Sequence, residues 1–383
     1  MKKLKFVIMA SIIFINLIIT AGCWNYRELD KLAIVAGAAI DKDSDGLYIV
    51  TAEIVQVGGG VETKSTPKLV SMNGKTVLDA IRNGISTTGK KLYWSHCKVV
   101  ILSKDVAEEG ITKFIDVFVR DAEIRDDVNI LYSQQDTAKE IFEGEEITES
   151  IKSFALEDII KNQNSLSKAP KMDILNFSIE RQTKGISTVI PTVHLEEING
   201  SIVPKVIGTA IIKNDKIAGE LSGDETKFLL FIRDQLKGGV LVEQKGENIS
   251  APVSLEIFGN KTKVKPVVEA GKLKFRIDIK TSVGVDEVEG NENFIEEKAV
   301  SELEAGASES TKENITGLIK KIQSEYGADV FKFGEKLREN NIKEWNRVSD
   351  KWDDVFRDLE VDVNVKVRIK NSSILVKTLK KGG

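Results

Sequence analysis

The chain has 383 residues and a formal net charge of −4 at pH 7, and 41% of its residues are hydrophobic. A chain of this length and composition can bury two or three cores of ordinary domain size. Its acidic balance is unsuited to nucleic acid, which is bound by basic surfaces, so we expect no nucleic-acid partner.

The first 22 residues have the pattern of a secretory signal. Three lysines among the first five residues precede a mostly apolar run over 6–19, and small residues follow it up to Cys23. The run is short for a bilayer crossing, which needs about 20 apolar residues, and Asn16 interrupts it. We therefore expect residues 1–22 to be removed on export, which leaves a chain with a net charge of −7.

Cys23 directly follows the small residues, as in a bacterial lipoprotein signal. In that class the thiol receives a diacylglyceryl group, and the amine exposed by cleavage can carry a further fatty acid such as palmitate. Each buried methylene adds about 0.8 kcal/mol, so two acyl chains hold a protein on a membrane. Cys23 is therefore the predicted lipid attachment site. Ordinary secretion stays open, because Thr20 stands where leucine is usual.

Catalytic and metal-binding residues are scarce. After Cys23 the only cysteine is Cys97, so a lipidated monomer has no internal disulfide. Cys97 opens an apolar strand pattern over 94–101, which predicts a buried, inert thiol. His96 is its neighbour, and adjacent strand residues face opposite sides, so the two cannot easily form a catalytic pair. With His194 as the only other histidine, we expect no enzyme activity and no cofactor.

Region 23–197 alternates strand and helix patterns, which predicts a mixed α/β domain. A hairpin with an Asp-Gly turn is expected over 32–55, followed by a flexible loop over 57–67. The remaining expected elements are helices at 77–85 and 111–120 and strands near 99 and at 128–132.

Two polar stretches are candidate boundaries. Residues 161–171 could be a linker or an exposed loop, and 196–205 contains Asn-Gly-Ser and a proline. We place the main boundary at the second stretch. The expected organisation is an N-terminal domain over 23–197, which could subdivide near 161–171, and a C-terminal domain over 206–383.

The pattern of the C-terminal region predicts an antiparallel sheet covered by long helices. Together with the N-terminal mixed α/β domain, it predicts an α+β fold for the whole chain. Ser222 and Glu225 have the spacing of a capping box that starts a helix. A helical tract follows over 294–357, with breaks near Gly327 and Gly334. The expected strands are at 206–212, 217–221, 253–257, 273–279 and 359–369.

Three short motifs have simpler structural explanations. Gly84–Lys90 spells most of a phosphate-binding loop, but it closes a helix where such a loop would open one, so a glycine C-cap is expected. Asp41–Gly46 matches the first half of a calcium loop, but Ala52 stands where a bidentate Glu is required, which favours a solvated acidic turn. Ser65 and Lys68 have the spacing of penicillin-recognising enzymes without their partner motifs.

Several segments together resemble the Ger(x)C family of spore germination lipoproteins. The first is Cys23–Asp30, which runs into Leu32–Gly37. Further matching segments are Ser95–Ile101, Ala107–Ile111, Phe114–Phe118, Arg120–Asp121 with Arg125, Ile207–Ala210, Ala218–Gly223 with Glu225–Thr226, Lys237–Gly239, and Trp345 with Trp352 before Phe356. The likeness therefore extends from the signal to the last strand. It departs at Thr20 and at an acidic insert around 302–313.

The resemblance implies a non-catalytic C subunit of a nutrient germinant receptor. Such a subunit is lipid-anchored on the outer face of the spore's inner membrane, beside two integral membrane partners, the A and B subunits. His96, Arg120 and Asp121 are candidates for structural or interface roles, and a buried ion pair is the alternative for the last two. From the residues alone, a lipid-anchored solute-binding protein that captures a ligand between two domains stays open.

Overall fold

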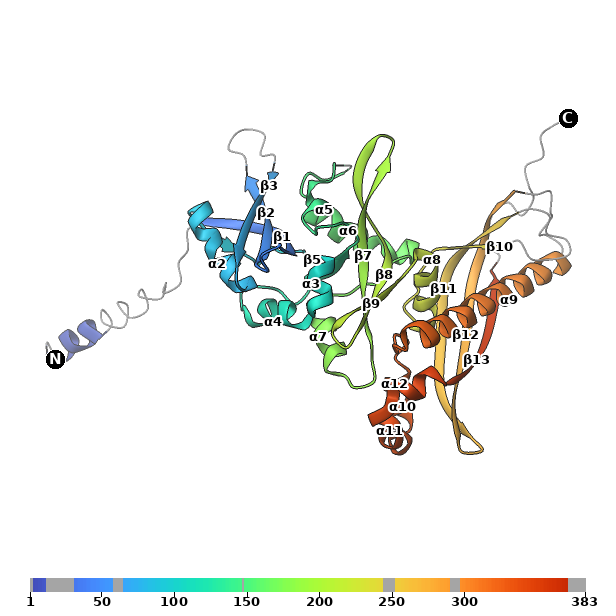
Figure 1. Cartoon of the computed structure of the whole chain (residues 1–383). Helices are drawn as coiled ribbons and strands as arrows, with labels where there is room; N and C mark the ends of the chain where they lie inside the picture. Colours follow the sequence, from blue (N-terminus) through green and yellow to red (C-terminus); the bar gives the residue numbers. More distant parts are fainter. Residues whose placement is uncertain are drawn as a thin grey trace.

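The computed structural model describes residues 3–11, 31–57, 65–146, 148–243, 252–289 and 297–370. The predicted lipid site Cys23 and most of the loop predicted at 57–67 lie outside these ranges. Within them the strands form one nine-stranded and one four-stranded sheet. Figure 1 shows the four-stranded sheet at the end of the molecule away from helix α2. The α+β fold class predicted from the sequence is confirmed.

The nine-stranded sheet has the order β3-β2-β1-β5-β6-β7-β8-β9, and β4 pairs with β1 beside this path. Its strands are β1 (Leu32–Lys42), β2 (Tyr48–Val57), β3 (Ser65–Gly74), β4 (Lys91–Tyr93), β5 (Val99–Leu102), β6 (Asn129–Ser133), β7 (Thr188–Ile198), β8 (Ser201–Lys213) and β9 (Lys216–Leu221). The central strands β1, β5, β6 and β7 run parallel, and the outer pairs are antiparallel. Parallel strands need crossover helices, which explains the alternating pattern of the N-terminal region.

Helices cover both faces of this sheet. In β5, Val100 and Leu102 belong to one core, and Val99 and Ile101 belong to a second core on the opposite face. The first core is closed by α2 (Val77–Thr88), α3 (Lys104–Glu109), α4 (Thr112–Arg120) and α7 (Ile174–Gln182), and the second by α5 (Glu140–Glu143) and α6 (Lys152–Leu166). α2 ends at Gly89 with φ of 65°, so the helix C-cap predicted there is confirmed.

The β1–β2 hairpin is confirmed, and its register pairs Asp41 with Ile49. Gly46 has φ of 82°, which suits glycine in the turn. The loop prediction extends too far, because β3 begins at Ser65 as an edge strand. Only alternate residues of its second half are buried, so its sequence gives a weak strand signal.

Residues 161–171 do not form a linker. α6 continues through Leu166, and in the turn that follows it Ser167 and Ala169 are buried against the sheet. The Gln163 side chain lies inside this turn, where its Oε1 accepts hydrogen bonds from two backbone N–H groups and its Nε2 donates to the carbonyl of Val206. The polar composition reflects hydrogen bonding within a buried turn, which composition alone does not separate from an exposed loop.

The stretch 196–205, where we expected the main boundary, is a β-hairpin. β7 and β8 pair from Thr188 with Ile212 to Ile198 with Ser201, across a turn at Asn199 and Gly200. The nine-stranded sheet is therefore continuous across the expected boundary, and residues 201–221 complete it. The polar residues lie at the exposed tip of a hairpin, which resembles a linker in composition.

The four-stranded sheet has the order β10-β11-β12-β13. Its strands are β10 (Val240–Glu243), β11 (Val253–Glu269), β12 (Lys272–Val288) and β13 (Glu360–Ile369). β11 and β12 form the expected antiparallel hairpin, but β13 pairs with β12 in parallel, Val363 beside Ile277. The prediction of a purely antiparallel sheet is wrong at this strand. Alternating burial sets a strand's face and carries no information on its direction.

Helices pack on this sheet, and Figure 1 shows α9 crossing it. They are α8 (Gly223–Ile232), α9 (Glu297–Lys321), the π-helical turn η2 (Ile322–Tyr326), α10 (Phe333–Asn340), α11 (Ile342–Val348), the 3-10 turn η3 (Ser349–Lys351) and α12 (Trp352–Arg357). The Ser222–Glu225 capping box and the break at Gly327 are confirmed. The second break lies just before α10, because Gly334 is already helical.

Candidate functional site

His96 and Cys97 lie in a turn between β4 and β5, so the strand that we expected at these residues begins only at Val99. The His96 side chain is exposed, whereas Cys97 is buried and its thiol donates to the carbonyl of Val99 at 3.5 Å. Burial raises the pKa of Cys97 to about 12, so the thiol stays neutral at physiological pH. A neutral, enclosed sulfur is a poor nucleophile, and the exposed imidazole does not activate it.

His194 lies on β7, far along the chain from His96. Its Nδ1 is buried and has no hydrogen-bond partner among the described residues, and burial lowers the pKa of this imidazole. Across the described ranges no three His, Cys, Asp or Glu side chains converge in a way that could hold a metal ion. A lone neutral histidine in a strand is explained by packing.

Arg120 and Asp121 do not form the ion pair that we considered. Arg120 Nε lies 2.5 Å from Asp116 Oδ2, one turn earlier on α4, and its side chain is 77% exposed. Asp121 ends the helix, and its carboxylate accepts a hydrogen bond from the Glu123 N–H at 3.0 Å. Arg120 is thus a surface group, and Asp121 shapes the turn after α4. An interface role for these residues and for His96 stays a prediction.

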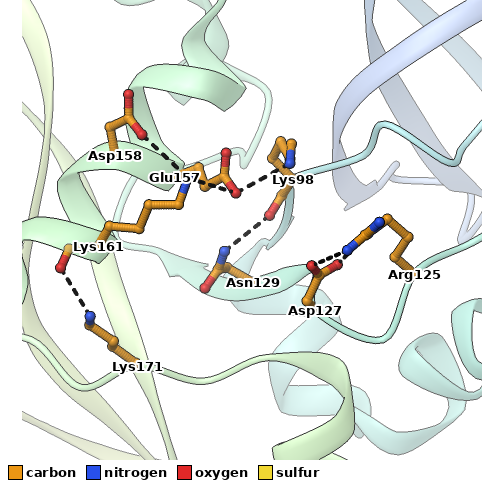
Figure 2. A network of polar contacts seen from close by, with 8 residues as sticks. All are labelled: Lys98, Arg125, Asp127, Asn129, Glu157, Asp158, Lys161 and Lys171. Atoms are coloured by element: carbon orange, nitrogen blue, oxygen red, sulfur yellow. Dashed lines mark hydrogen bonds and ion pairs between the residues drawn. The ribbon is translucent and has the colours of Figure 1, made fainter.

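Figure 2 shows a network of polar contacts around Lys98, two residues after His96. Lys98 Nζ lies 3.3 Å from Glu157 Oε1 on α6, and the Lys98 carbonyl accepts a hydrogen bond from Asn129 Nδ2 at 3.3 Å. Lys161 also pairs with Glu157, at 3.1 Å. These contacts hold α6 against the starts of β5 and β6.

The outer members of the network are paired as well (Figure 2). Arg125 donates two hydrogen bonds to Asp127, at 2.9 and 2.7 Å, and lowers the pKa of that carboxyl. Lys171 donates to the Lys161 carbonyl at 3.0 Å, and burial lowers its pKa. A set of side chains that satisfy one another has little capacity left for an anionic or cationic ligand. We therefore interpret the network as structural.

Two buried carboxylates on the β1–β2 hairpin hold the helices of the second core. Asp41 accepts hydrogen bonds from the N–H groups of Ala138 and Lys139, at 2.6 and 3.1 Å, where α5 begins. Glu53 accepts from the N–H groups of Lys152 and Ser153, both at 2.8 Å, where α6 begins. Burial raises the pKa of both carboxyls, and the N–H donors oppose that shift. Asp41 is 4% exposed, so the expected acidic turn is not solvated at its first residue.

A third buried carboxylate, Asp329, starts α10. It accepts hydrogen bonds from the N–H groups of Phe333 and Gly334, at 3.0 and 2.7 Å, and from Trp352 Nε1 at 3.1 Å. Burial raises the pKa of Asp329 to about 6, against the opposing effect of these donors. The Asp329 carbonyl also accepts from the Ser187 N–H at 3.0 Å, just before β7. This residue therefore links the α10–α12 helices to the nine-stranded sheet.

A buried charged cluster, which we call the joint, connects the two sheets. It consists of Glu180 on α7, Arg233 after α8 and Lys332 before α10. Glu180 Oε1 lies 2.8 Å from Lys332 Nζ and 3.6 Å from an Arg233 guanidinium nitrogen, and Arg233 Nε donates to the Val330 carbonyl at 2.6 Å. The exposed fractions of the Glu180 and Arg233 side chains are 8% and 2%. The joint brings together three segments that carry no local sequence signal for such a contact.

Two hollows lie where the two halves meet. One has a volume of about 230 Å³ and is lined by Gln163, Ser167, Leu230, Asp234 and Lys237. The other has a volume of about 540 Å³ and lies between the end of α6, α8, β10 and α9. Elsewhere between the halves, Lys213 Nζ donates to the carbonyls of Tyr326 and Gly327 at 3.2 and 2.7 Å. Polar contacts thus help to hold the two halves together.

Family models match both halves of the chain. Residues 25–195 match a family described as "Spore germination protein N-terminal domain", and residues 207–373 match one described as "Spore germination B3/ GerAC like, C-terminal".

Curated relatives match over nearly the whole length. Spore germination protein B3 of Bacillus subtilis (strain 168) is 27% identical, over 94% of this chain and 96% of that protein. Spore germination proteins YndF and A3 of the same organism are 28% and 26% identical, each over 94% of this chain and over 95% and 96% of their own lengths. The crystal structure of the GerBC protein has a TM-score of 0.61 and 23% identity, over 88% of this chain and 97% of that chain, so the fold is shared.

Proposed function

We propose a function from a premise that the family models establish: the chain belongs to the GerAC-like family of spore germination proteins. The proposal is that it is the C subunit of a nutrient germinant receptor, lipid-anchored through Cys23. It would lie on the outer face of the spore's inner membrane, in contact with the integral membrane A and B subunits. The observation that carries the proposal is the match of both halves to germination proteins over nearly their full lengths.

A non-catalytic role is supported by the surroundings of the reactive side chains. The Cys97 thiol is buried with a pKa of about 12, and the exposed His96 imidazole lies outside that enclosure. In the described parts of the chain, no helix is both long and apolar enough to cross a bilayer. We propose that the lipid on Cys23 attaches the chain to the membrane, because two acyl chains give lasting binding.

Solute capture between two domains is the competing function, and the halves meet in a way that does not favour it. Of the two hollows between the halves, the one beside Gln163 and Leu230 has a volume of about 230 Å³, below the roughly 300–1,000 Å³ of typical ligand pockets, whereas the one of about 540 Å³ falls within that range. The joint and Asp329 also cross between the halves, which opposes the domain closure by which such proteins capture a ligand. Contacts with partner subunits are the use that this scaffold supports better.

The test is a replacement experiment in spores that lack the native copy. Wild-type protein should fractionate with membranes, co-purify with the integral subunits and support nutrient-triggered germination. Cys23→Ala should lose all three, because it removes the lipid attachment. Cys97→Ala is the matched control, since it removes the other cysteine and leaves the anchor, and it should germinate as wild type does.

Two results would contradict the proposal. The first is full nutrient response in spores whose Cys23→Ala protein is recovered free of membranes. The second is saturable nutrient binding by the purified chain without its partners, which would establish the solute-binding function.

A further inference from the structure

One end of the nine-stranded sheet carries a surface that is both basic and apolar. On α2, the large aliphatic side chains of Leu78 and Ile85 are 45% and 43% exposed. Basic side chains surround them. We call this the α2 surface and define it by six exposed residues: Lys68, Lys75, Leu78, Arg82, Ile85 and Lys90.

The helical period places three of these six residues on one side of α2. Leu78, Arg82 and Ile85 follow one another at intervals of four and three residues, so they form one stripe on α2. The side of the helix that is buried on the sheet, which carries Val77 and Ile81, lies about 100° around the helix axis from this stripe. The stripe therefore lies on an exposed flank of α2, beside its buried side.

The cations of the α2 surface have acidic neighbours, because Asp79 lies on the same helix and Arg82 lines a small hollow with Asp121 and Glu123. Within the part of the chain that the structure describes, the side chains of Lys68, Lys75, Arg82 and Lys90 form no ion pair, whereas Lys98 and Arg120 elsewhere on the same half do. These four cations lie on a chain whose net charge is −4. An acidic protein with one basic face is attracted to an anionic surface in one orientation only.

The position of the α2 surface relative to the predicted anchor points to the membrane. A hollow of about 640 Å³ is lined by the start of β1, including Leu32, and by Lys68, Thr88 and Lys90. Leu32 follows Cys23 by nine residues, and an extended chain spans at most about 3.6 Å per residue, so this end of the sheet lies within about 30 Å of the lipid. Figure 1 shows α2 at the outer end of the molecule, away from the four-stranded sheet.

We propose that the α2 surface docks on the anionic phospholipid surface of the membrane to which Cys23 is anchored. Arg82 and the three lysines contact lipid phosphates, and Leu78 and Ile85 enter the interfacial region, as in amphipathic interfacial helices. The acidic remainder of the chain is repelled by the same surface, so docking fixes the orientation. The four-stranded sheet then points away from the bilayer. The inference rests on the proposed lipid anchor.

The test uses the mature lipoprotein in vesicles that contain a nitroxide-labelled lipid. A fluorophore is attached to Ile85→Cys on the α2 surface or to Ile342→Cys on α11, which is 54% exposed at the other half of the molecule. Cys97 does not compete for the label, because it is buried with a pKa of about 12. We expect the label at 85 to be quenched in vesicles with phosphatidylglycerol and far less in pure phosphatidylcholine, and the label at 342 to be unquenched in both.

Charge reversals then separate this surface from general electrostatics. Arg82→Glu with Lys90→Glu should weaken docking about tenfold or more and remove the quenching at 85. Lys261→Glu with Lys343→Glu is the matched control, because both lysines are exposed, carry no ion pair among the described residues and give the same change in net charge. The control pair should leave the quenching at 85 unchanged.

The outcomes distinguish the two proposals. If the chain binds vesicles and the label at 85 is not quenched, the docking inference is overturned and the anchor stands. If the mature chain without charge reversals does not bind vesicles at all, the proposed anchor fails, and the docking inference fails with it. Shielding of position 85 only in the presence of the integral subunits would replace the membrane by a protein partner and overturn the inference.

Discussion

Three buried carboxylates act alike at the level of single residues. Each accepts hydrogen bonds from the N–H groups at the start of a helix: Asp41 and Glu53 from helices that begin far along the chain, and Asp329 from α10, which begins four residues after it. These N–H groups have no partner within their own helix, and the positive end of the helix favours a negative charge. Each carboxylate thereby fixes where a helix meets the rest of the fold.

Replacing Asp329 tests this role. Three donors surround the Asp329 carboxylate: the N–H groups of Phe333 and Gly334 and the Nε1–H of Trp352. Asp329→Asn replaces one acceptor oxygen with an NH₂ group, which is itself a donor and therefore faces at least one of these donors without forming a hydrogen bond. We expect a loss of about 2–3 kcal/mol in the free energy of unfolding at neutral pH, measured by urea denaturation. Asp354→Asn, an exposed neighbour on α12, should cost less than about 0.5 kcal/mol. Equal effects of the two variants would exclude the capping role.

Cys97 gives a second prediction at this scale. Because its sulfur is buried and the pKa of its thiol is about 12, reaction with a thiol reagent at pH 8 should be negligible in the native protein. The same thiol should react within seconds after unfolding in urea. In the Cys23→Ala chain the reaction reports Cys97 alone, and fast labelling without denaturant would contradict its burial.

The difference between the capping box and these carboxylates shows what could be predicted at single positions. Ser222 and Glu225 lie three residues apart, so their reciprocal hydrogen bonds were predicted from local spacing and are confirmed. Asp41 caps a helix start 97 residues away, and no local pattern indicates such a pair. The Arg120–Asp121 ion pair was wrong for a related reason, because a helix turns Arg120 toward Asp116.

At the level of elements, periodicity predicted type better than pairing or extent. The odd-residue alternation over 359–369 identified β13, but its parallel pairing with β12 depends on where α9 to α12 return the chain. The hairpin at 196–205 was mistaken for a boundary, because hairpin tips and linkers share the same polar residues. β3 lies at an edge with one exposed face, so tertiary contacts supply what its sequence lacks.

Glu109 links four elements and provides a test that depends on pH. Its carboxylate accepts hydrogen bonds from Tyr48 on β2 at 2.9 Å and from Lys42 on β1 at 3.1 Å, and it pairs with Lys113 on α4. Burial alone would raise the pKa of Glu109, but these partners outweigh it and lower the pKa to about 2. The charged form is therefore stabilised more in the folded state than in the unfolded chain.

The consequence for stability follows from that direction. A depressed carboxyl pKa adds stability above the usual value of 4.5, and this stability is lost as the pH falls toward 2. Because the Glu109 side chain is 31% exposed, screening reduces the contribution, and Glu109→Gln should cost about 1 kcal/mol at pH 7. The cost should shrink between pH 4.5 and 3 in urea titrations. Glu108→Gln, whose side chain is 54% exposed, should show little cost at any pH.

At the level of the whole molecule, the two sheets share one core. Val189, Ile211 and Leu221 of the nine-stranded sheet belong to the same buried cluster as Phe275 and Phe333 of the C-terminal half. The joint and the Ser187–Asp329 hydrogen bond lie beside this cluster. We therefore expect the chain to unfold as one unit, although its two halves match separate family models.

Two probes placed in the two halves test this cooperativity. In a background that carries Cys23→Ala, Trp24→Phe and Trp94→Phe, the buried Trp345 and Trp352 of the C-terminal half are the remaining tryptophans, and the Cys97 thiol reports the N-terminal core. Both signals should change at the same urea concentration.

Glu180→Ala removes the carboxylate from the joint and leaves Arg233 buried without it, which should lower the free energy of unfolding by about 3–5 kcal/mol. Both transitions should then move together to lower urea, whereas Glu197→Ala on the exposed end of β7 should move neither. If Glu180→Ala shifts the tryptophan transition and leaves the Cys97 transition in place, the halves unfold independently, because an intact shared core would have coupled them.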